Sequence, residues 1–354
     1  MGASSPLATG FARGAKQPEV LLQAAVSAAR DKLGGQTVTA ALFLFSPPLA
    51  SVTPTMLQAQ MRQLRCLQVA AATFPGVFTD SDQALGESAC AVLLLASPLN
   101  IRVRNPKPEE HSQCLSWGRL DLVQKDWLHQ HARVGSLSSR NGRFWLQATP
   151  QNALDIYFQG LTPTRSLWSA GMRPLSAALS VHRQEGSLLL ELERYMALPL
   201  LAQNIPVSIR KDAQLPLERL LIAELAHDAL PDSPPELLHI RATELNRSGL
   251  WLERPLAENS RAFLTLRDPT IAERDTRIVL DEIHHQESEI ALAWISSSIG
   301  RDATFFGTED RDLQMWREQF PDVPMIGAYG MGELLPIQER SHFMRYSKIF
   351  TTFT

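Results

Sequence analysis

The stretch at residues 289–336, EIALAWISSSIGRDATFFGTEDRDLQMWREQFPDVPMIGAYGMGELLP, decides how the rest of the sequence is interpreted. It begins with an apolar run at 290–295, which stops at a serine triplet that starts with Ser296. Gly300 and Arg301 follow the serines. This pattern predicts a buried strand that opens into a polar loop.

A helix and a second strand are expected downstream. Apolar residues recur at spacings of three and four over 313–320, and two prolines end that pattern before the apolar run 325–328. The run leads into a turn in which Gly330 and Gly332 bring main-chain amides close to whatever lies there. Two polar loops at like ends of neighbouring strands predict a ligand site.

An earlier stretch has the same order of elements. It has an apolar run at 40–45, a loop from Ser46, a helical pattern at 55–64 and a second apolar run at 67–72, which leads to Gly76. The two stretches favour an internal duplication, although strand-loop-helix-strand is also the commonest unit of α/β proteins and needs none. We expect an α/β (α+β) fold of two related domains, each a mixed β-sheet flanked by helices.

The order and spacing of these pieces resemble the FIST family (F-box and intracellular signal transduction). Its C-terminal domain carries a Cys-Asn-Gly-Arg-Gly-like loop, then Phe-Gly, then Asp, then a Gly-Phe-x-x-x-Gly-Glu-Ile-x-Pro turn. The matching residues here are Ser298, Ile299, Gly300, Arg301 and Asp302, then Phe306 and Gly307, then Asp312, then 327–329 and 332–336. Ser298, Ile299 and Asp302 depart from the pattern, so roles held by those positions in the family are not carried over.

The resemblance also covers the N-terminal half, at Phe45-Ser46 and at 69–76, and a junction at 171–174. It implies a FIST N-terminal domain at 18–174 and a FIST C-terminal domain at 175–354, and residues 1–17, which are small, polar and unpatterned, are expected to form an N-terminal tail. Such domains are regarded as bacterial-type sensory modules for small ligands. Amino acids have been proposed as ligands, and one subset binds haem and senses nitric oxide. The resemblance therefore implies signal transduction through a separate protein, such as a kinase or cyclase.

Two charged residues in the strand-end loops suit an amino acid or a similar metabolite. Arg301 could hold a carboxylate in a bidentate fork, and Glu333 could accept an ammonium group. Each also has a structural interpretation, as an ion pair for Arg301 and as a hydrogen bond to the turn for Glu333. The expected ligand-binding residues are Ser46, Thr73, Gly76, Ser296, Ser298, Gly300, Arg301, Gly330, Gly332 and Glu333.

Two other functions stay open, a haem-based nitric-oxide sensor and a non-catalytic interaction scaffold. His182 is the candidate haem ligand because it lies in a strand-like segment, yet no haem-attachment motif surrounds it and an ordinary strand histidine is the simpler interpretation. No metal site or resident cofactor is expected. The cysteines, at 66, 90 and 114, match neither zinc nor redox spacing, and we expect free, mostly buried thiols.

Composition and motifs exclude several classes of function. The 354 residues contain 34 Lys plus Arg against 37 Asp plus Glu, with no dense basic run, so we expect no nucleic-acid binding. The apolar run 89–96 is far shorter than the roughly 20 residues of a membrane span, and the start lacks a signal peptide. We therefore expect a soluble, cytoplasmic protein. Catalytic motifs such as a nucleophile elbow, P-loop or HExxH are missing, so we do not expect an enzyme.

Several other segments have patterns that predict helices, a hairpin or loops. Residues 19–33 and 271–286 predict helices, and 150–159 looks helical with Pro at its start. A hairpin is expected around Gly186. The segment 217–230 fits a helix by period, although its LLIAEL run also suits a strand. Two prolines followed by charged residues predict a surface loop at 105–110, and the Asn141-Gly142 pair predicts a turn.

Overall fold

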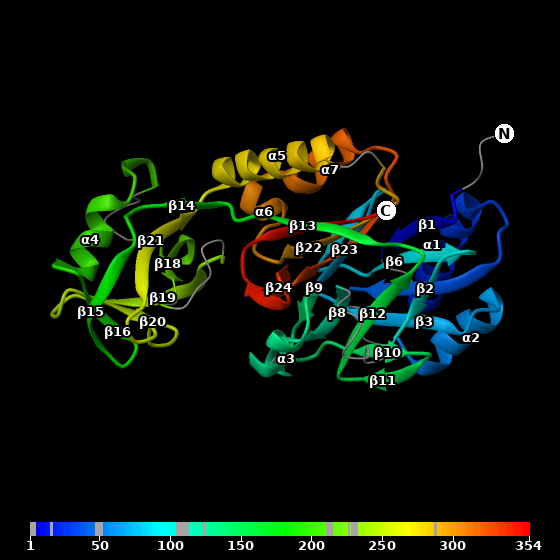
Figure 1. The fold of residues 1–354 in the computed structure, drawn as a ribbon, viewed down its shortest axis with the longest axis horizontal. Helices are drawn as coiled ribbons and strands as arrows, with labels where there is room; N and C mark the ends of the chain where they lie inside the picture. Colours follow the sequence, from blue (N-terminus) through cyan, green and yellow to red (C-terminus); the bar gives the residue numbers. More distant parts are fainter. Residues whose placement is uncertain are drawn as a thin grey trace. The chain divides into compact units, whose positions relative to one another are not determined.

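The computed structural model describes residues 5–14, 17–46, 52–103, 113–122, 125–209, 215–225, 227, 233–286 and 289–354 (Figure 1). The chain divides into two compact units, Met1–Ser169 with Thr276–Thr354 and, separately, Ala170–Asp275. Strands outnumber helices, and both occur in the larger unit, which confirms the expected mixed α/β class.

The larger unit contains three six-stranded sheets. The first has the order β1 (Leu7–Arg13), β6 (Ala89–Ala96), β2 (Val38–Phe45), β3 (Gln68–Thr73), β10 (Phe144–Leu146) and β11 (Thr149–Gln151). The second has the order β13 (Pro163–Ser169), β26 (Lys348–Phe353), β22 (Leu292–Ser298), β23 (Met325–Gly330), β4 (Gly76–Thr79) and β5 (Gln83–Leu85). The third has the order β7 (Asn100–Arg102), β12 (Ala153–Gln159), β8 (Cys114–Arg119), β9 (Arg133–Ser138), β24 (Gly332–Ile337) and β25 (Arg340–Met344).

One strand pattern recurs in all three sheets: two antiparallel strands, a parallel pair, then a hairpin. The parallel pairs are β2–β3, β8–β9 and β22–β23. Their crossovers contain α2 (Pro54–Leu64), α3 (Lys125–Gln130), and α6 (Ala303–Phe306) with α7 (Arg311–Gln319). The two strand-helix-strand units expected from the sequence are therefore confirmed. The structure adds a third, β8–α3–β9, that the sequence did not reveal as a repeat.

The hairpins interlock the sheets. The hairpin β4–β5 follows β3 along the chain but joins the second sheet, β10–β11 follows β9 and joins the first, and β24–β25 follows β23 and joins the third. Strands from both ends of the chain therefore share sheets within one compact unit. For this reason the limits of the compact units differ from the boundary between residues 174 and 175 that the family resemblance implied.

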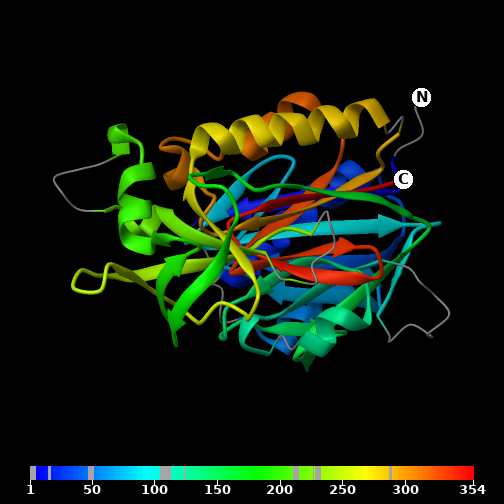
Figure 2. The same ribbon diagram turned by 60° about the vertical axis from the view of Figure 1, so that its left-hand side comes forward.

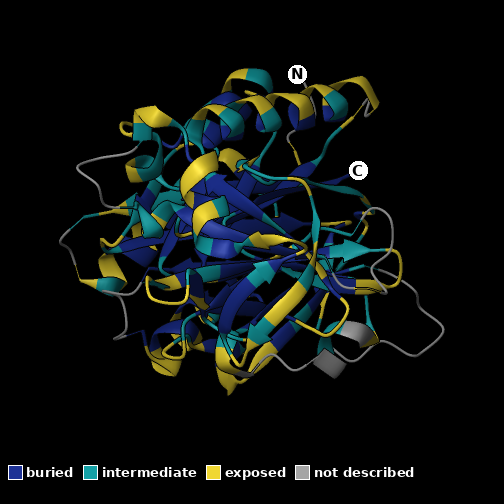
Figure 3. Cartoon of the chain, turned by 90° about the vertical axis from the view of Figure 1, so that its left-hand side faces the viewer, coloured by how far each residue is buried: buried dark blue, intermediate teal, exposed yellow. Residues whose placement is uncertain are grey.

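Apolar packing explains why these strands stack. The inner faces of the three sheets share one core, which includes Leu42 of the first sheet, Trp294 of the second and Trp117 of the third. Helices cover outer faces: α1 (Pro18–Leu33) and α2 pack on the first sheet, and α5 (Pro269–Gln286) and α7 pack on the second. Figure 2 shows α5 and α7 side by side over that sheet, and Figure 3 shows the strands of the sheets as largely buried.

The smaller unit is a six-stranded antiparallel barrel. Its strands follow the order β21 (Arg261–Arg267), β15 (Leu179–Glu185), β16 (Leu188–Leu192), β20 (Gly249–Leu252), β19 (Glu236–Glu244) and β18 (Leu220–Leu225), and β18 closes onto β21. Further elements are β14 (Met172–Pro174), β17 (Tyr195–Met196), α4 (Ala197–Asn204) and two short 3-10 helices, at Val207–Ile209 and Leu217–Arg219. The expected hairpin is confirmed as β15–β16, where Gly186 has a φ of 57°. A leucine-rich core fills the barrel.

Some local predictions are wrong. The segment expected to be an N-terminal tail, 1–17, contains β1, which pairs with β6. Residues 150–159 form β11 and β12 rather than a helix, since Leu154 and Ile156 alternate into the shared core with the period of two of a strand. The ambiguous 217–230 segment contributes strand β18. The predicted loop at 105–110 lies outside the described residues. No helix among the described residues has the length and apolar character to cross a bilayer.

Candidate functional site

The carboxyl ends of strands from all three sheets lie close together. The main-chain N–H of Met331, which follows β23, donates to the carbonyl of Leu137 in β9 at 2.7 Å. The N–H of Thr73, at the end of β3, donates to the carbonyl of Arg143 at 2.9 Å. The gathering of parallel-strand carboxyl ends is the place where α/β proteins commonly bind ligands. The structure therefore places Thr73 and Gly330, which the sequence assigned to separate halves, each beside the end of β9: Thr73 lines a pocket with Ser138, and Gly330 packs against the carbonyl of Leu137.

A pocket of about 200 Å³ opens between the ends of β3 and β9. It is lined by Thr73, Phe74, Pro75, Ser138, Ser139, Asn141, Gly142 and Arg143. This volume is below the roughly 300–1,000 Å³ of pockets for drug-sized ligands. The pocket therefore suits a small metabolite, held by hydroxyl and amide groups from two sheets.

The walls of the pocket are held by hydrogen bonds and aromatic contacts. Thr73 Oγ1 accepts from the N–H of Arg143 at 2.8 Å, and the N–H of Gly142 donates to the carbonyl of Ser139 at 2.8 Å. Phe74 packs edge-on against Trp117 at 6.2 Å between ring centroids. The 139–142 turn and the aromatic floor are therefore ordered before a ligand arrives, which lowers the entropic cost of binding.

Glu333 is completely buried in β24. Ser347 Oγ donates to its Oε2 at 2.9 Å, while its Oε1 has no hydrogen-bond partner in the described part of the chain. Burial raises the pKa of this carboxyl to about 8, because desolvation outweighs the Ser347 hydrogen bonds and the charges of Arg301 and Arg345. The carboxyl is therefore mostly neutral at pH 7, which differs from the ammonium-binding carboxylate expected from the sequence.

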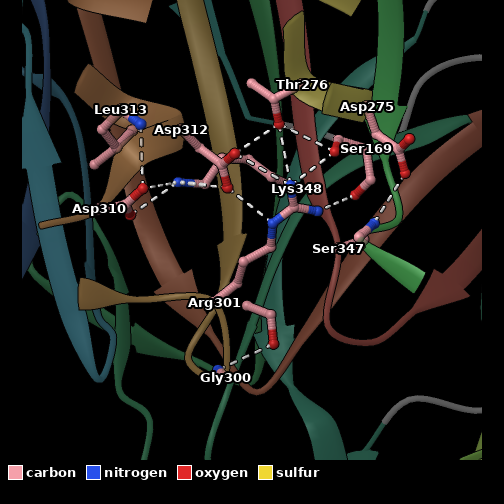
Figure 4. A network of polar contacts seen from close by, with 12 residues as sticks. Ser169, Asp275, Thr276, Gly300, Arg301, Asp310, Asp312, Leu313, Ser347 and Lys348 are labelled. Atoms are coloured by element: carbon pink, nitrogen blue, oxygen red, sulfur yellow. Dashed lines mark hydrogen bonds and ion pairs between the residues drawn. The ribbon is translucent and has the colours of Figure 1, made fainter. Parts of the chain in front are cut away.

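Arg301 is buried in a polar network between β22, α5 and α7 (Figure 4). Its Nε lies 2.8 Å from Asp312 Oδ2, and its Nη2 donates to Ser169 Oγ at 2.7 Å and to Thr276 Oγ1 at 3.0 Å. This is the structural ion pair that the sequence left open as the alternative role. Its predicted contact with a ligand carboxylate stays a prediction.

The same network contains a second buried ion pair that sequence analysis missed. Lys348 Nζ lies 2.8 Å from both carboxylate oxygens of Asp310, and Tyr329 Oη donates to Asp310 Oδ2 at 2.6 Å. Burial, followed by the neighbouring Asp310, holds the pKa of Tyr329 well above its usual range. Asp310 also caps α7 through the N–H of Leu313. The network therefore ties the start of α7 to the outer face of the second sheet.

Three predicted serines serve the protein's own hydrogen bonds. Trp294 Nε1 donates to Ser296 Oγ at 2.8 Å, and Ala89 N–H donates to Ser46 Oγ at 2.7 Å. Ser298 Oγ accepts from the N–H of Gly300 at 3.3 Å, which shapes the loop after β22. These contacts give the side chains structural roles, and their predicted ligand contacts stay predictions.

Three predicted glycines lie where strands approach closely. A Cβ on Gly330 would lie 3.0 Å from the carbonyl oxygen of Leu137, and one on Gly332 would lie 2.2 Å from the Phe343 ring. Gly76 is in β4 and follows Pro75 of the pocket without lining it, and a Cβ there would lie 2.5 Å from the carbonyl oxygen of Ala84. Close packing of the interlocked strands therefore accounts for these glycines.

His182, the candidate haem ligand, lies on β15 of the smaller unit with 67% of its side chain exposed, 3.9 Å from Glu191. The surrounding hollow is lined by Ser180, Val181, His182, Glu191, Glu193 and Arg194. Only one of these side chains is aliphatic. Such a surface provides little of the apolar environment that haem requires.

The remaining sequence predictions concern metals and thiols. All three cysteines are free and buried, as expected. Among the described residues, no group of three His, Cys, Asp or Glu side chains could hold a metal ion. No protein-family model matches the chain, and no curated protein matches its sequence. The resemblance to the FIST family therefore rests on the motifs and spacings of the sequence.

Proposed function

We propose that this protein is a FIST-type sensor that binds a small metabolite and reports the bound state to a separate protein, such as a kinase or cyclase. The observation that carries the proposal is the pocket between the ends of β3 and β9, which contains Thr73, a residue that sequence analysis placed in the ligand site. A cytoplasmic location and an amino-acid ligand both belong to the proposal.

The chemistry of the pocket supports a small, polar ligand. Ser138, Ser139 and Asn141 can donate and accept hydrogen bonds, and Phe74 supplies an apolar surface. An amino acid or a molecule of similar size would match this mixture of polar rim and aromatic floor. No catalytic step is part of the proposal.

The interlocked hairpins offer a route by which binding could reach a partner. The 139–142 turn, which forms one wall of the pocket, leads directly into the β10–β11 hairpin of the first sheet. A ligand that binds one position of this turn more tightly than another would shift the hairpin's conformational equilibrium. The matching strand-helix-strand units β2–α2–β3 and β22–α6–α7–β23 support an internal duplication, with FIST N-terminal and C-terminal domains at 18–174 and 175–354 as the proposed assignment.

A thermal-shift screen of amino acids and related metabolites tests the binding step. Ser139→Phe would fill the pocket, and Asn152→Phe places the same side chain at an exposed position outside it. We expect at least one compound to raise the melting temperature of the wild type and of Asn152→Phe by several degrees, but not that of Ser139→Phe. Absence of any active compound, or an equal shift in Ser139→Phe, would overturn the proposal.

A further inference from the structure

Three neighbouring residues of the third sheet each carry a buried polar atom that has no hydrogen-bond partner among the described residues. Trp117 of β8 is in register with Ser136 of β9, and Ser136 is directly opposite Glu333 of β24. All three residues are fully buried. Trp117 Nε1, Ser136 Oγ and Glu333 Oε1 have no hydrogen-bond partner within the described residues. We call Trp117, Ser136 and Glu333 the polar row.

The polar row faces the core shared by the three sheets. Side chains two residues apart in a strand point to the same face, and both Val134 and Leu335, which lie two residues from Ser136 and Glu333, belong to that core. Trp117 belongs to it as well. Buried polar groups are almost always hydrogen-bonded, since leaving them dry is unfavourable. Three unpartnered atoms side by side therefore point to a molecule that completes them.

The hydrogen-bonding character of the row identifies the kind of group that fits. Glu333 Oε2 already accepts from Ser347, so in the neutral carboxyl the proton belongs on Oε1. Burial keeps this carboxyl mostly neutral at pH 7, against the opposing charges of Arg301 and Arg345. The row then presents an indole N–H, a serine O–H and a carboxyl O–H. All three can donate to an oxygen acceptor.

We propose that the polar row binds the oxygen of a small carbonyl or carboxylate group. Neighbouring strands are roughly 4.8 Å apart, so the outer two residues are separated by roughly 10 Å at the backbone. The long side chains of Trp117 and Glu333 can close much of that distance above the short Ser136. A protonated buried carboxyl that donates to an oxygen is a known way to stabilise such a group.

The row adjoins the strand-end pocket without being part of it. Phe74 lines the pocket and packs edge-on against Trp117, so displacement of the Phe74 ring is a route of entry from the pocket floor. The inference needs neither signalling nor a ligand in the outer pocket. Ser139→Phe tests the outer pocket alone, so the two proposals can fail separately.

Calorimetric titration with acetate, acetamide and methylammonium tests the row at pH 6 and pH 9.5. We expect acetate and acetamide to bind the wild type at pH 6 and at least tenfold more weakly at pH 9.5, where Glu333 is ionised. Glu333→Gln, which keeps an N–H donor and cannot ionise, should bind acetamide equally at both values. Ser136→Ala should bind acetate and acetamide at least tenfold more weakly than the wild type does at pH 6. Ser297→Ala removes another buried hydroxyl that has no partner in the part of the chain that the structure describes, and it should leave binding unchanged.

Two outcomes would overturn the assignment. Tighter binding of methylammonium at pH 9.5 would show an ionised Glu333 acting as acceptor. No binding of any probe, together with a high-resolution structure in which an ordered water alone completes the row, would show a purely structural role. Far-UV circular dichroism establishes that Glu333→Gln and Ser136→Ala are folded before either is titrated.

Discussion

Glu333 lies directly opposite Ser136 across β24 and β9, and its carboxyl is completely buried. The first core-facing residues of the other two hairpins are Val77 in β4 and Phe144 in β10, both part of the shared apolar core. One of three similarly placed hairpins therefore carries an ionisable group into the core. This difference makes the protein's stability sensitive to pH.

We predict that the free energy of unfolding decreases as pH rises from about 4.5 to about 8. The pKa of Glu333 is about 8 in the folded protein and near the ordinary glutamate value of 4.5 in the unfolded chain, so the folded protein holds the proton more tightly. Its stabilising contribution is complete below pH 4.5 and is lost as pH rises through 8. Between these two pKa values, the free energy of unfolding falls by up to about 1.4 kcal/mol for each pH unit.

Urea unfolding of wild type and Glu333→Gln at several pH values isolates this contribution. The glutamine of the variant cannot ionise, so the difference in free energy of unfolding between the two proteins should change over this pH range. Parallel curves for the two proteins would mean that Glu333 titrates near its ordinary pKa in the folded state.

The Arg301–Asp312 ion pair should be strongly stabilising relative to a broken pair. Arg301→Ala leaves the buried Asp312 carboxylate without its main partner, which typically costs about 3–5 kcal/mol. Arg165→Ala breaks the exposed ion pair with Glu282 and should cost less than about 1 kcal/mol. Urea unfolding of the two variants and the wild type measures these losses in free energy of unfolding. A negligible loss in Arg301→Ala, with loss of metabolite binding, would instead support the ligand-carboxylate role.

Gly330→Ala should separate the strand ends that meet at the site. The new Cβ would lie 2.9 Å from the carbonyl oxygen of Gly332 and 3.0 Å from that of Leu137, and backbone on both sides leaves little room to relax. We expect a loss of about 1–3 kcal/mol in chemical denaturation. Gly118→Ala is the control, since its Cβ would meet its nearest neighbours at 3.6 Å. Equal stability of the two variants would contradict the close approach of β23 and β9.

His182 should make no haem complex. Its side chain is 67% exposed beside Glu191, so it lacks the apolar enclosure of an axial ligand. Protein expressed with ample haem should therefore show no stoichiometric Soret band. A band in the wild type that is lost in His182→Ala would establish the haem-sensor alternative.

The strands that the sequence revealed are those that are buried along nearly their whole length. β6 and β2 are almost continuously apolar because sheet neighbours and packing bury both faces, and β22 and β23 show the same signature. β1 and β12 carry weaker patterns because only part of each strand is buried: the last three residues of β1 and five of the seven residues of β12 are partly or fully exposed. The exchange of hairpins among three sheets leaves no local signal, because it is decided by tertiary packing.

The candidate site was likewise visible only in part. Thr73 and Gly330 follow apolar runs, so strand-end reasoning found both. The turn at Asn141-Gly142 was also predicted, but its position beside Thr73 depends on β10 pairing with β3. In the sequence, Lys348 has the pattern of the first residue of an ordinary strand. Its ion pair with Asp310 joins residues that are 38 positions apart. Such contacts cannot be read from spacing within one segment.

Native mass spectrometry with a defined metabolite mixture tests the central claim most directly. It measures whether the pocket between β3 and β9 holds a small molecule. We predict one adduct of metabolite size at a 1:1 ratio on the wild type and on Asn152→Phe, and none on Ser139→Phe. No adduct on the wild type, or the same adduct on Ser139→Phe, would contradict the account.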